Sequence, residues 1–122
     1  MTKAKSLLDL VELREKVLAT MGKEFTTLIV EGYYELIKEL ITAIAAIDGY
    51  KILSHELLVG YLAKFYNEIL QAEIYLIDQL RKTRNDIAYR GVMIKPEYLA
   101  RNKESIASII NKLKQLTLKK LS

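Results

Sequence analysis

The spacing of apolar residues between Thr26 and Asp48 constrains the fold more than any other feature of the sequence. Large apolar residues recur there every three or four positions, which is the period of one face of an α-helix. Residues 41–47 are apolar on nearly all sides, so several helices are expected to pack closely around them. The stretch therefore predicts a long central helix over 26–48. Its predicted inward face carries Ile29, Tyr33, Leu36, Leu40, Ile44 and Ile47, and the opposite face carries Glu31, Glu35, Lys38 and Thr42.

The rest of the chain shows the same period, together with residues that start and end helices. Ser54 is an expected N-cap, Pro96 suits the first position of a helix, and Gly22 and Gly91 suit left-handed helix ends. We also expect helices over residues 6–21 and 68–89, and one that begins at Pro96. A short helix is expected from residue 55, and its predicted inward face carries Leu57, Leu58, Tyr61, Leu62 and Phe65.

Composition agrees with an all-α fold. Only five Gly and one Pro occur, in a chain rich in Leu, Ile, Lys, Glu and Ala, which favours helices joined by short turns over sheets. We therefore predict a single domain over residues 1–122, an up-and-down bundle of four long helices plus one short helix. A bundle this small with so many large aliphatic residues is expected to form a homodimer.

The absence of cysteine and the distribution of charge narrow the classes of function. Without Cys there is no disulfide, thiolate zinc site or cysteine nucleophile, and a reducing compartment is expected. No apolar run is long enough for a membrane span, so we predict a soluble cytoplasmic protein. Residues 1–80 carry eight Lys and Arg against twelve Asp and Glu (net −4), whereas residues 81–122 carry eleven against three (net +8). This split suits a solvated face, a complementary subunit contact or a polyanionic partner.

The sole histidine, His55, offers little to a metal site. No second His or Cys lies at metal-ligand spacing from it, so no metal or cofactor is expected. Because His55 directly follows the N-cap Ser54, we predict a local structural role for it.

Arg84 is the strongest functional indication in the sequence. Ile77, Leu80, Arg84 and Ile87 fall at spacings of three, four and three, so a guanidinium stands where an apolar residue is expected. An unpaired buried guanidinium costs several kcal/mol or more, so a carboxylate, backbone carbonyls or a bound phosphate must hold it. Beside it, Arg81, Asn85 and Tyr89 form a predicted polar strip near the end of the helix.

The segment Arg84–Gly91, Arg-Asn-Asp-Ile-Ala-Tyr-Arg-Gly, resembles the signature of HEPN domains. In that signature an Arg and a polar neighbour precede a His by about four to six intervening positions near the end of a helix. The resemblance to archaeal and bacterial members extends over about Tyr33 to Leu116. Its other elements are Tyr33-Tyr34-Glu35 opening a long helix, Asp48-Gly49-Tyr50-Lys51, and Ser54-His55-Glu56.

The resemblance implies a helical bundle that dimerises with its two motif helices facing each other across a cleft. Many members are metal-independent endoribonucleases, often toxins or defence proteins, and many pair with a minimal nucleotidyltransferase. By position, Arg84 matches the Arg that stabilises charge on the scissile phosphate, Asn85 its polar neighbour, and Tyr89 the His that moves protons. These three are the candidate catalytic residues, and Arg81, Arg84 and Arg90 are the candidate nucleic-acid contacts.

Tyr89 departs from the signature, because a phenol titrates near pH 10 and is a poor base at neutral pH. Three hypotheses therefore stand. The first is a HEPN-like dimer of a toxin–antitoxin or defence module that binds RNA or a nucleotide, with catalysis weak or absent. The second is an active endoribonuclease in which Tyr89 replaces the His. The third is a structural protein that docks a nucleotidyltransferase, with Arg84 in an interfacial ion pair with a carboxylate such as Asp78 or Asp86.

Overall fold

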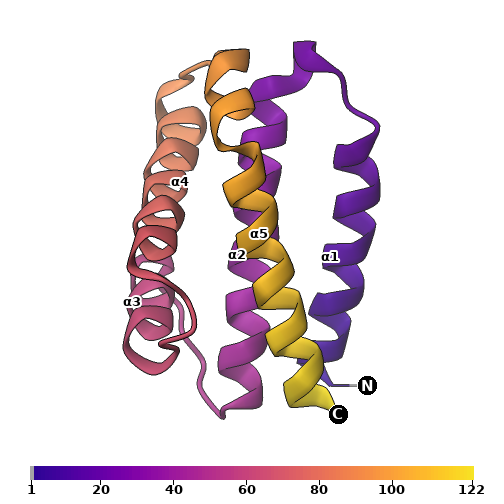
Figure 1. Ribbon diagram of the computed structural model, residues 1–122, viewed down its shortest axis with the longest axis vertical. Coiled ribbons are helices and arrows are strands. Elements are labelled where there is room, and N and C mark those ends of the chain that lie inside the picture. The colour runs from indigo at the N-terminus through magenta and orange to yellow at the C-terminus, as the bar shows by residue number, and fades with distance from the viewer. Residues whose placement is uncertain (1) are drawn as a thin grey trace.

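A computed structural model of the chain describes residues 2–122, which form an all-α bundle with no strand in that range (Figure 1). The predicted fold class, four long helices plus one short helix, is confirmed. The elements are α1 (Lys3–Ala19), the 3₁₀ turn η1 (Lys23–Phe25), α2 (Thr26–Ile47), α3 (His55–Phe65), α4 (Gln71–Arg90) and α5 (Pro96–Leu121). Within residues 2–122, none of these helices has both the length and the apolar character needed to cross a membrane.

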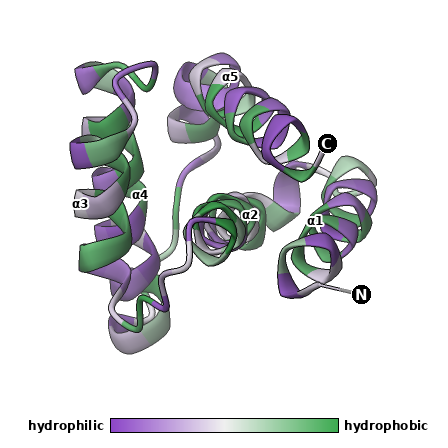
Figure 2. Cartoon of the chain, turned by 90° about the horizontal axis from the view of Figure 1, so that it is seen from below, coloured by the Kyte–Doolittle hydropathy of each residue, from purple (hydrophilic) through white to green (hydrophobic). Residues whose placement is uncertain are grey.

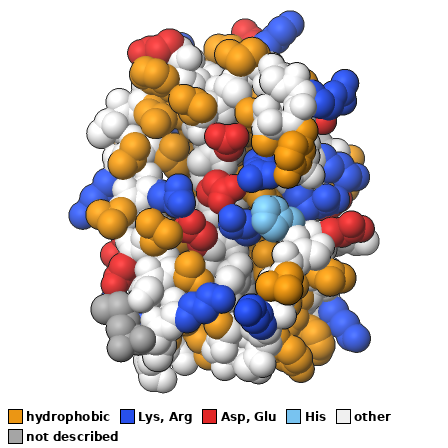
Figure 3. Space-filling view, turned by 180° about the vertical axis from the view of Figure 1, so that it is seen from behind, with side chains coloured by type: hydrophobic (Ala, Val, Ile, Leu, Met, Phe, Trp, Pro, Cys, Tyr) orange, Lys and Arg blue, Asp and Glu red, His pale blue; other side chains and the backbone are white. Residues whose placement is uncertain are grey.

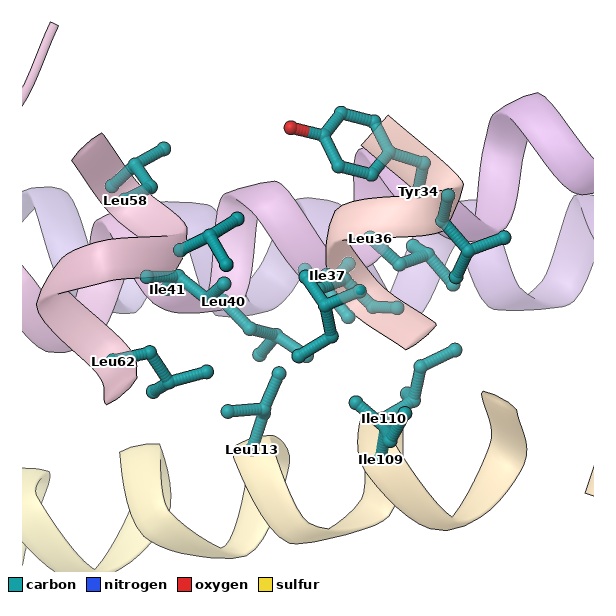
Figure 4. Close-up of a cluster of buried hydrophobic side chains, with 14 of the residues drawn as sticks. Tyr34, Leu36, Ile37, Leu40, Ile41, Leu58, Leu62, Ile109, Ile110 and Leu113 are labelled. Atoms are coloured by element: carbon teal, nitrogen blue, oxygen red, sulfur yellow. The ribbon is translucent and has the colours of Figure 1, made fainter. Parts of the chain in front are cut away.

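The central helix is α2. It lies between the α3–α4 pair on one side and α1 and α5 on the other (Figure 2). Residues Ile41, Ala43, Ile44 and Ala45 are all buried, as the apolar run predicts. Side chains from α3 and α5 point toward the apolar row of α2 in Figure 4. Because neighbours pack on both sides, the buried surface of α2 is broader than one stripe.

Two residues of the predicted inward face, Tyr33 and Ile47, are only partly buried. Tyr34 is buried, with 2% of its surface exposed. In α3 the prediction placed too many residues inward: Leu57 and Phe65 are 63% and 54% exposed, while Leu58, Tyr61 and Leu62 are buried. Because α3 packs mainly against α2 and α4, it buries one narrow face, which cannot include both flanks.

Most predicted helix ends are present. The Ser54 hydroxyl accepts a hydrogen bond from the Leu57 N–H at the start of α3, Pro96 is the first residue of α5, and Gly91 ends α4 with φ +67°. Gly22 is not a left-handed cap: α1 ends at Ala19 and Gly22 has φ −86°. The Thr20 N–H and hydroxyl both donate to the Val17 carbonyl, and this closes the helix before Gly22 is reached.

Asp48 joins three segments at one end of the bundle. Both the Tyr61 and the Tyr66 hydroxyls donate to one of its carboxylate oxygens, and Lys120 Nζ donates to the other at 2.8 Å. Partial burial opposes ionisation, but these hydrogen bonds outweigh it and lower the pKa of Asp48. The end of α2 is thereby tied to α3 and to the last turns of α5.

Candidate nucleic-acid interface

Arg84 projects from α4 toward α2, where Glu35 meets it. Its Nε lies 3.5 Å from Glu35 Oε1, and the two side chains are 24% and 18% exposed. The same Nε is buried without a hydrogen-bond acceptor, and one terminal nitrogen donates weakly to Asn85 Oδ1 at 3.5 Å. A carboxylate is thus close to the guanidinium, as the sequence predicts, but it neutralises the charge without accepting from the Nε–H.

Within the chain, the carboxylate partner of Arg84 is Glu35, and not Asp78 or Asp86, which the third hypothesis names as examples for an interfacial pair. Asp78 pairs with Arg81 at 2.8 Å and with Lys82 at 3.4 Å, and Asp86 pairs with Arg90 at 3.5 Å. These are contacts within one turn of the same helix, at i, i+3 or i, i+4 spacing. Glu35 comes from the neighbouring helix instead, which spacing within one helix does not reveal.

A second cation also holds Glu35. Lys38 Nζ lies 2.7 Å from Glu35 Oε2, so the carboxylate is shared between Lys38 and Arg84. Arg81, one turn before Arg84, has a side chain that is only 15% exposed. Two helices therefore place three cations at a partly buried surface, where Glu35 and Asp78 are their carboxylate partners.

His55 joins these cations from the start of α3. Its ring lies 5.9 Å from the ring of Tyr34. Burial lowers the pKa of His55, and the charges of Lys38, Arg84 and Arg81 lower it further, against the opposing effect of Glu35. The histidine expected to be only structural thus lies within the electrostatic reach of Arg84. We call Lys38, His55, Arg81 and Arg84 the basic cluster.

The basic cluster lies on one face of the bundle (Figure 3). The single histidine, in pale blue, is flanked there by Lys and Arg side chains, with acidic side chains beside them. Sequence reasoning missed Lys38 and could not place His55 beside the motif. Lys38 follows Glu35 by three positions on the polar face of α2, and this spacing could have indicated the pair. The spacing of residues does not show that α3 packs beside α4, so it could not place His55.

Tyr89 and Arg90 stand apart from the basic cluster. The Tyr89 side chain is 78% exposed, and five residues of α-helix place it about 140° round and ~7.5 Å along from Arg84. Arg90 has a 74% exposed side chain and pairs with Asp86 of its own helix. Of the predicted site residues, the structure brings together Arg81, Arg84 and Asn85, and leaves Tyr89 and Arg90 at the exposed end of α4.

Tyr34, next to His55, is not a candidate base. Burial raises its pKa to about 12, so the phenol stays protonated at neutral pH. Within residues 2–122, no three His, Asp or Glu side chains gather closely enough to hold a metal ion. The chemistry open to the basic cluster is anion binding and proton transfer by an imidazole.

Comparison with protein-family models, with curated proteins and with solved structures gave no significant match. The function of the chain is therefore inferred from the motif, the fold and the geometry of the basic cluster.

Proposed function

We propose that the chain is a HEPN-like helical homodimer that binds RNA or a nucleotide through a phosphate held at the basic cluster. The observation that carries the proposal is the buried Arg84 Nε, which has no hydrogen-bond acceptor although Glu35 lies 3.5 Å away. A buried N–H without a partner costs about 1–3 kcal/mol, and a phosphate oxygen is the acceptor that a guanidinium fits best.

The neighbours of Arg84 suit the same ligand. Arg81 and Lys38 add positive charge, and His55 gains a proton more easily once an anion is bound beside it. The four groups come from three packed helices, so the cluster is held in place before any ligand arrives. Such a surface binds a phosphodiester or phosphomonoester without a metal ion.

The proposed context follows from the HEPN resemblance. It is a toxin–antitoxin or defence module, in which a minimal nucleotidyltransferase is the protein partner and the two α4 helices of the dimer face each other. Exposed apolar side chains at the end of α4, namely Tyr89, Val92 and Met93, support a contact there. In the structural alternative, Arg84→Ala would abolish the dimer and leave nucleic-acid affinity unchanged.

RNA binding tests the proposal directly. Fluorescence anisotropy with a labelled single-stranded RNA is expected to show binding that weakens steeply with salt, because phosphate contacts release counterions. Arg84→Gln is expected to weaken binding at least about tenfold. Arg101→Gln removes the same charge from an exposed position on α5 and is the matched control. Equal losses in the two variants would show that net charge, and not the basic cluster, binds the RNA.

Metal-independent RNA cleavage is the second candidate, and the position of His55 favours it. The imidazole that the motif lacks at Tyr89 is present beside Arg84, with a lowered pKa that leaves it neutral and able to accept a proton at pH 7. Cleavage of an RNA pool in EDTA by the wild type, but not by Arg84→Ala or His55→Ala, would support it. Cleavage by a Tyr89→His variant alone would mean that the wild type binds without cutting.

A further inference from the structure

An apolar groove runs between α1 and α2 on the same side of the molecule as the basic cluster. Its walls include Leu13, Val17 and Leu28, which are 60%, 55% and 50% exposed, and its volume is about 510 Å³. Small-molecule sites in proteins are mostly apolar and fall in the range of about 300–1,000 Å³. We call this surface the α1–α2 groove.

Polar groups at the edge of the groove are fixed in position. Arg14 lines the groove and donates from Nε to Glu39 Oε1 at 2.9 Å, where Glu39 is only 6% exposed. The buried carboxylate sets the plane of the guanidinium, and a guanidinium plane is a surface on which a nucleobase stacks. Glu31 and Glu35 line the other edge.

Glu35 links the groove to the basic cluster, because it lines the groove and also pairs with Arg84. Across this face the order is therefore an apolar groove, a row of carboxylates and a group of cations. Figure 3 shows the same order, with an apolar patch, acidic side chains in the middle, and basic side chains around the histidine. A ribonucleotide has the matching order of an apolar base, hydroxyl donors on ribose and an anionic phosphate.

We propose that the α1–α2 groove holds the base of a ribonucleotide unit whose ribose hydroxyls donate to Glu31 or Glu35 and whose phosphate binds the basic cluster. The inference rests on the proposed function and specifies its ligand. It requires that the 2′-hydroxyl and the base both add affinity, so RNA binds more tightly than DNA or an abasic strand. An apolar helix from a protein would instead remove Arg14, Glu31 and Glu35 from water without offering them any new hydrogen bond.

Three labelled strands of the same length test this inference in one anisotropy series: a short single-stranded RNA, the DNA of the same sequence, and the RNA made with abasic sites. The wild type is expected to bind RNA about tenfold more tightly than the abasic strand, since one seated base is worth about that factor. In the double variant Leu13→Ala with Val17→Ala, RNA affinity is expected to fall to that of the abasic strand, whose own affinity stays unchanged.

Leu70→Ala is the matched control, because Leu70 is 57% exposed at the start of α4, away from the groove. Equal wild-type affinity for RNA and the abasic strand would overturn the base site and leave phosphate binding intact. Wild-type protein that binds none of the strands would overturn the proposed function as well. A halving of mass in sedimentation by the double variant, without a change in base discrimination, would assign the groove to a second copy and overturn the inference.

Discussion

At the scale of single residues, Glu35 and Arg84 determine the charge balance of the basic cluster in the free protein. Glu35 is an anion of the protein itself, shared between Lys38 at 2.7 Å and Arg84 at 3.5 Å. Its negative charge reduces the repulsion among the cations, and this lowers the free-energy cost of holding Arg84 in a half-buried position. It also competes with any phosphate that approaches the same guanidinium.

Replacing Glu35 by Gln is therefore expected to tighten RNA binding by about threefold to tenfold at low salt, because the competing charge is removed. The same change is expected to lower the thermal midpoint, since the cations then repel one another without compensation. Anisotropy and thermal unfolding measure the two effects.

The matched control for this prediction is Glu15→Gln, which removes an equal charge from a pair with Lys114 between α1 and α5. It is expected to change RNA affinity by less than about twofold, because Glu15 pairs with α5 whereas the basic cluster lies on α2, α3 and α4. Weaker RNA binding by Glu35→Gln would contradict the competition and would show instead that Glu35 contributes mainly as an acceptor for the ribose hydroxyls.

His55 is expected to report ligand binding through its own titration. Burial and the charges of Lys38, Arg84 and Arg81 lower its pKa in the free protein. Protonation of His55 is therefore less favourable in the folded state than in the unfolded state. The contribution of His55 to stability is present above pH ~6.5 and is lost as the pH falls below that value. A bound phosphate favours the imidazolium and raises this pKa, so binding takes up a proton and affinity rises as the pH falls.

Proton NMR can follow the sole histidine without any assignment. The expected result is a pKa of His55 below about 6.5 that rises when RNA is added. For each pKa unit of that rise, RNA affinity is expected to increase by up to about tenfold as the pH is lowered. The His55→Gln variant is expected to bind RNA with little dependence on pH between 5 and 7. A histidine pKa that RNA leaves unchanged would exclude His55 from the site.

Arg84 shows how far the sequence predicts a site. Its spacing with Ile77 and Leu80 correctly indicates a guanidinium on a partly buried face that needs a counter-charge. The helix period says nothing about which neighbouring helix supplies it, so Glu35 and His55 are visible only once α2, α3 and α4 are packed. The motif match also places Tyr89 in a role that its exposed position at the end of α4 does not favour.

At the scale of helices, the period of apolar residues predicts that each element exists, and local chemistry decides where it ends. Ser54, Pro96 and Gly91 end or begin helices as predicted because each acts through its own backbone. The prediction at Gly22 is wrong because Thr20 closes α1 first, with hydrogen bonds that a Gly-based rule does not consider.

Gly91 and Gly60 form a matched pair for testing this reasoning. Gly91 has φ +67°, so Gly91→Ala is expected to cost about 1–2 kcal/mol of unfolding free energy through strain alone. Gly60 lies inside α3 with nothing within 4 Å of an added Cβ, so Gly60→Ala is expected to stabilise by about 0.5–1 kcal/mol. Chemical denaturation measures both, and the same sign for the two substitutions would contradict the assigned backbone conformations.

At the scale of the whole molecule, the bundle leaves apolar side chains uncovered at the exposed end of α4 as well as in the α1–α2 groove. Met93 is 77% exposed and Tyr89 78%, close to the segment that the HEPN resemblance places at a dimer interface. If two α4 ends meet there, each dimer carries two basic clusters, and a long strand of RNA can bind both. Affinity for a longer RNA then exceeds that for a short one through effective concentration, without any new contact.

Met93→Glu tests this arrangement, because two like charges brought together at a two-fold contact repel and lose the apolar burial. The wild type is expected to sediment as a dimer and the variant as a monomer. The variant is also expected to keep its affinity for a short RNA but to lose about tenfold for a long one. Leu118→Glu, at a 45% exposed position on α5, makes the same change elsewhere and is expected to leave the dimer intact. A monomeric wild type, or a dimer that Leu118→Glu disrupts and Met93→Glu does not, would place the subunit contact away from α4.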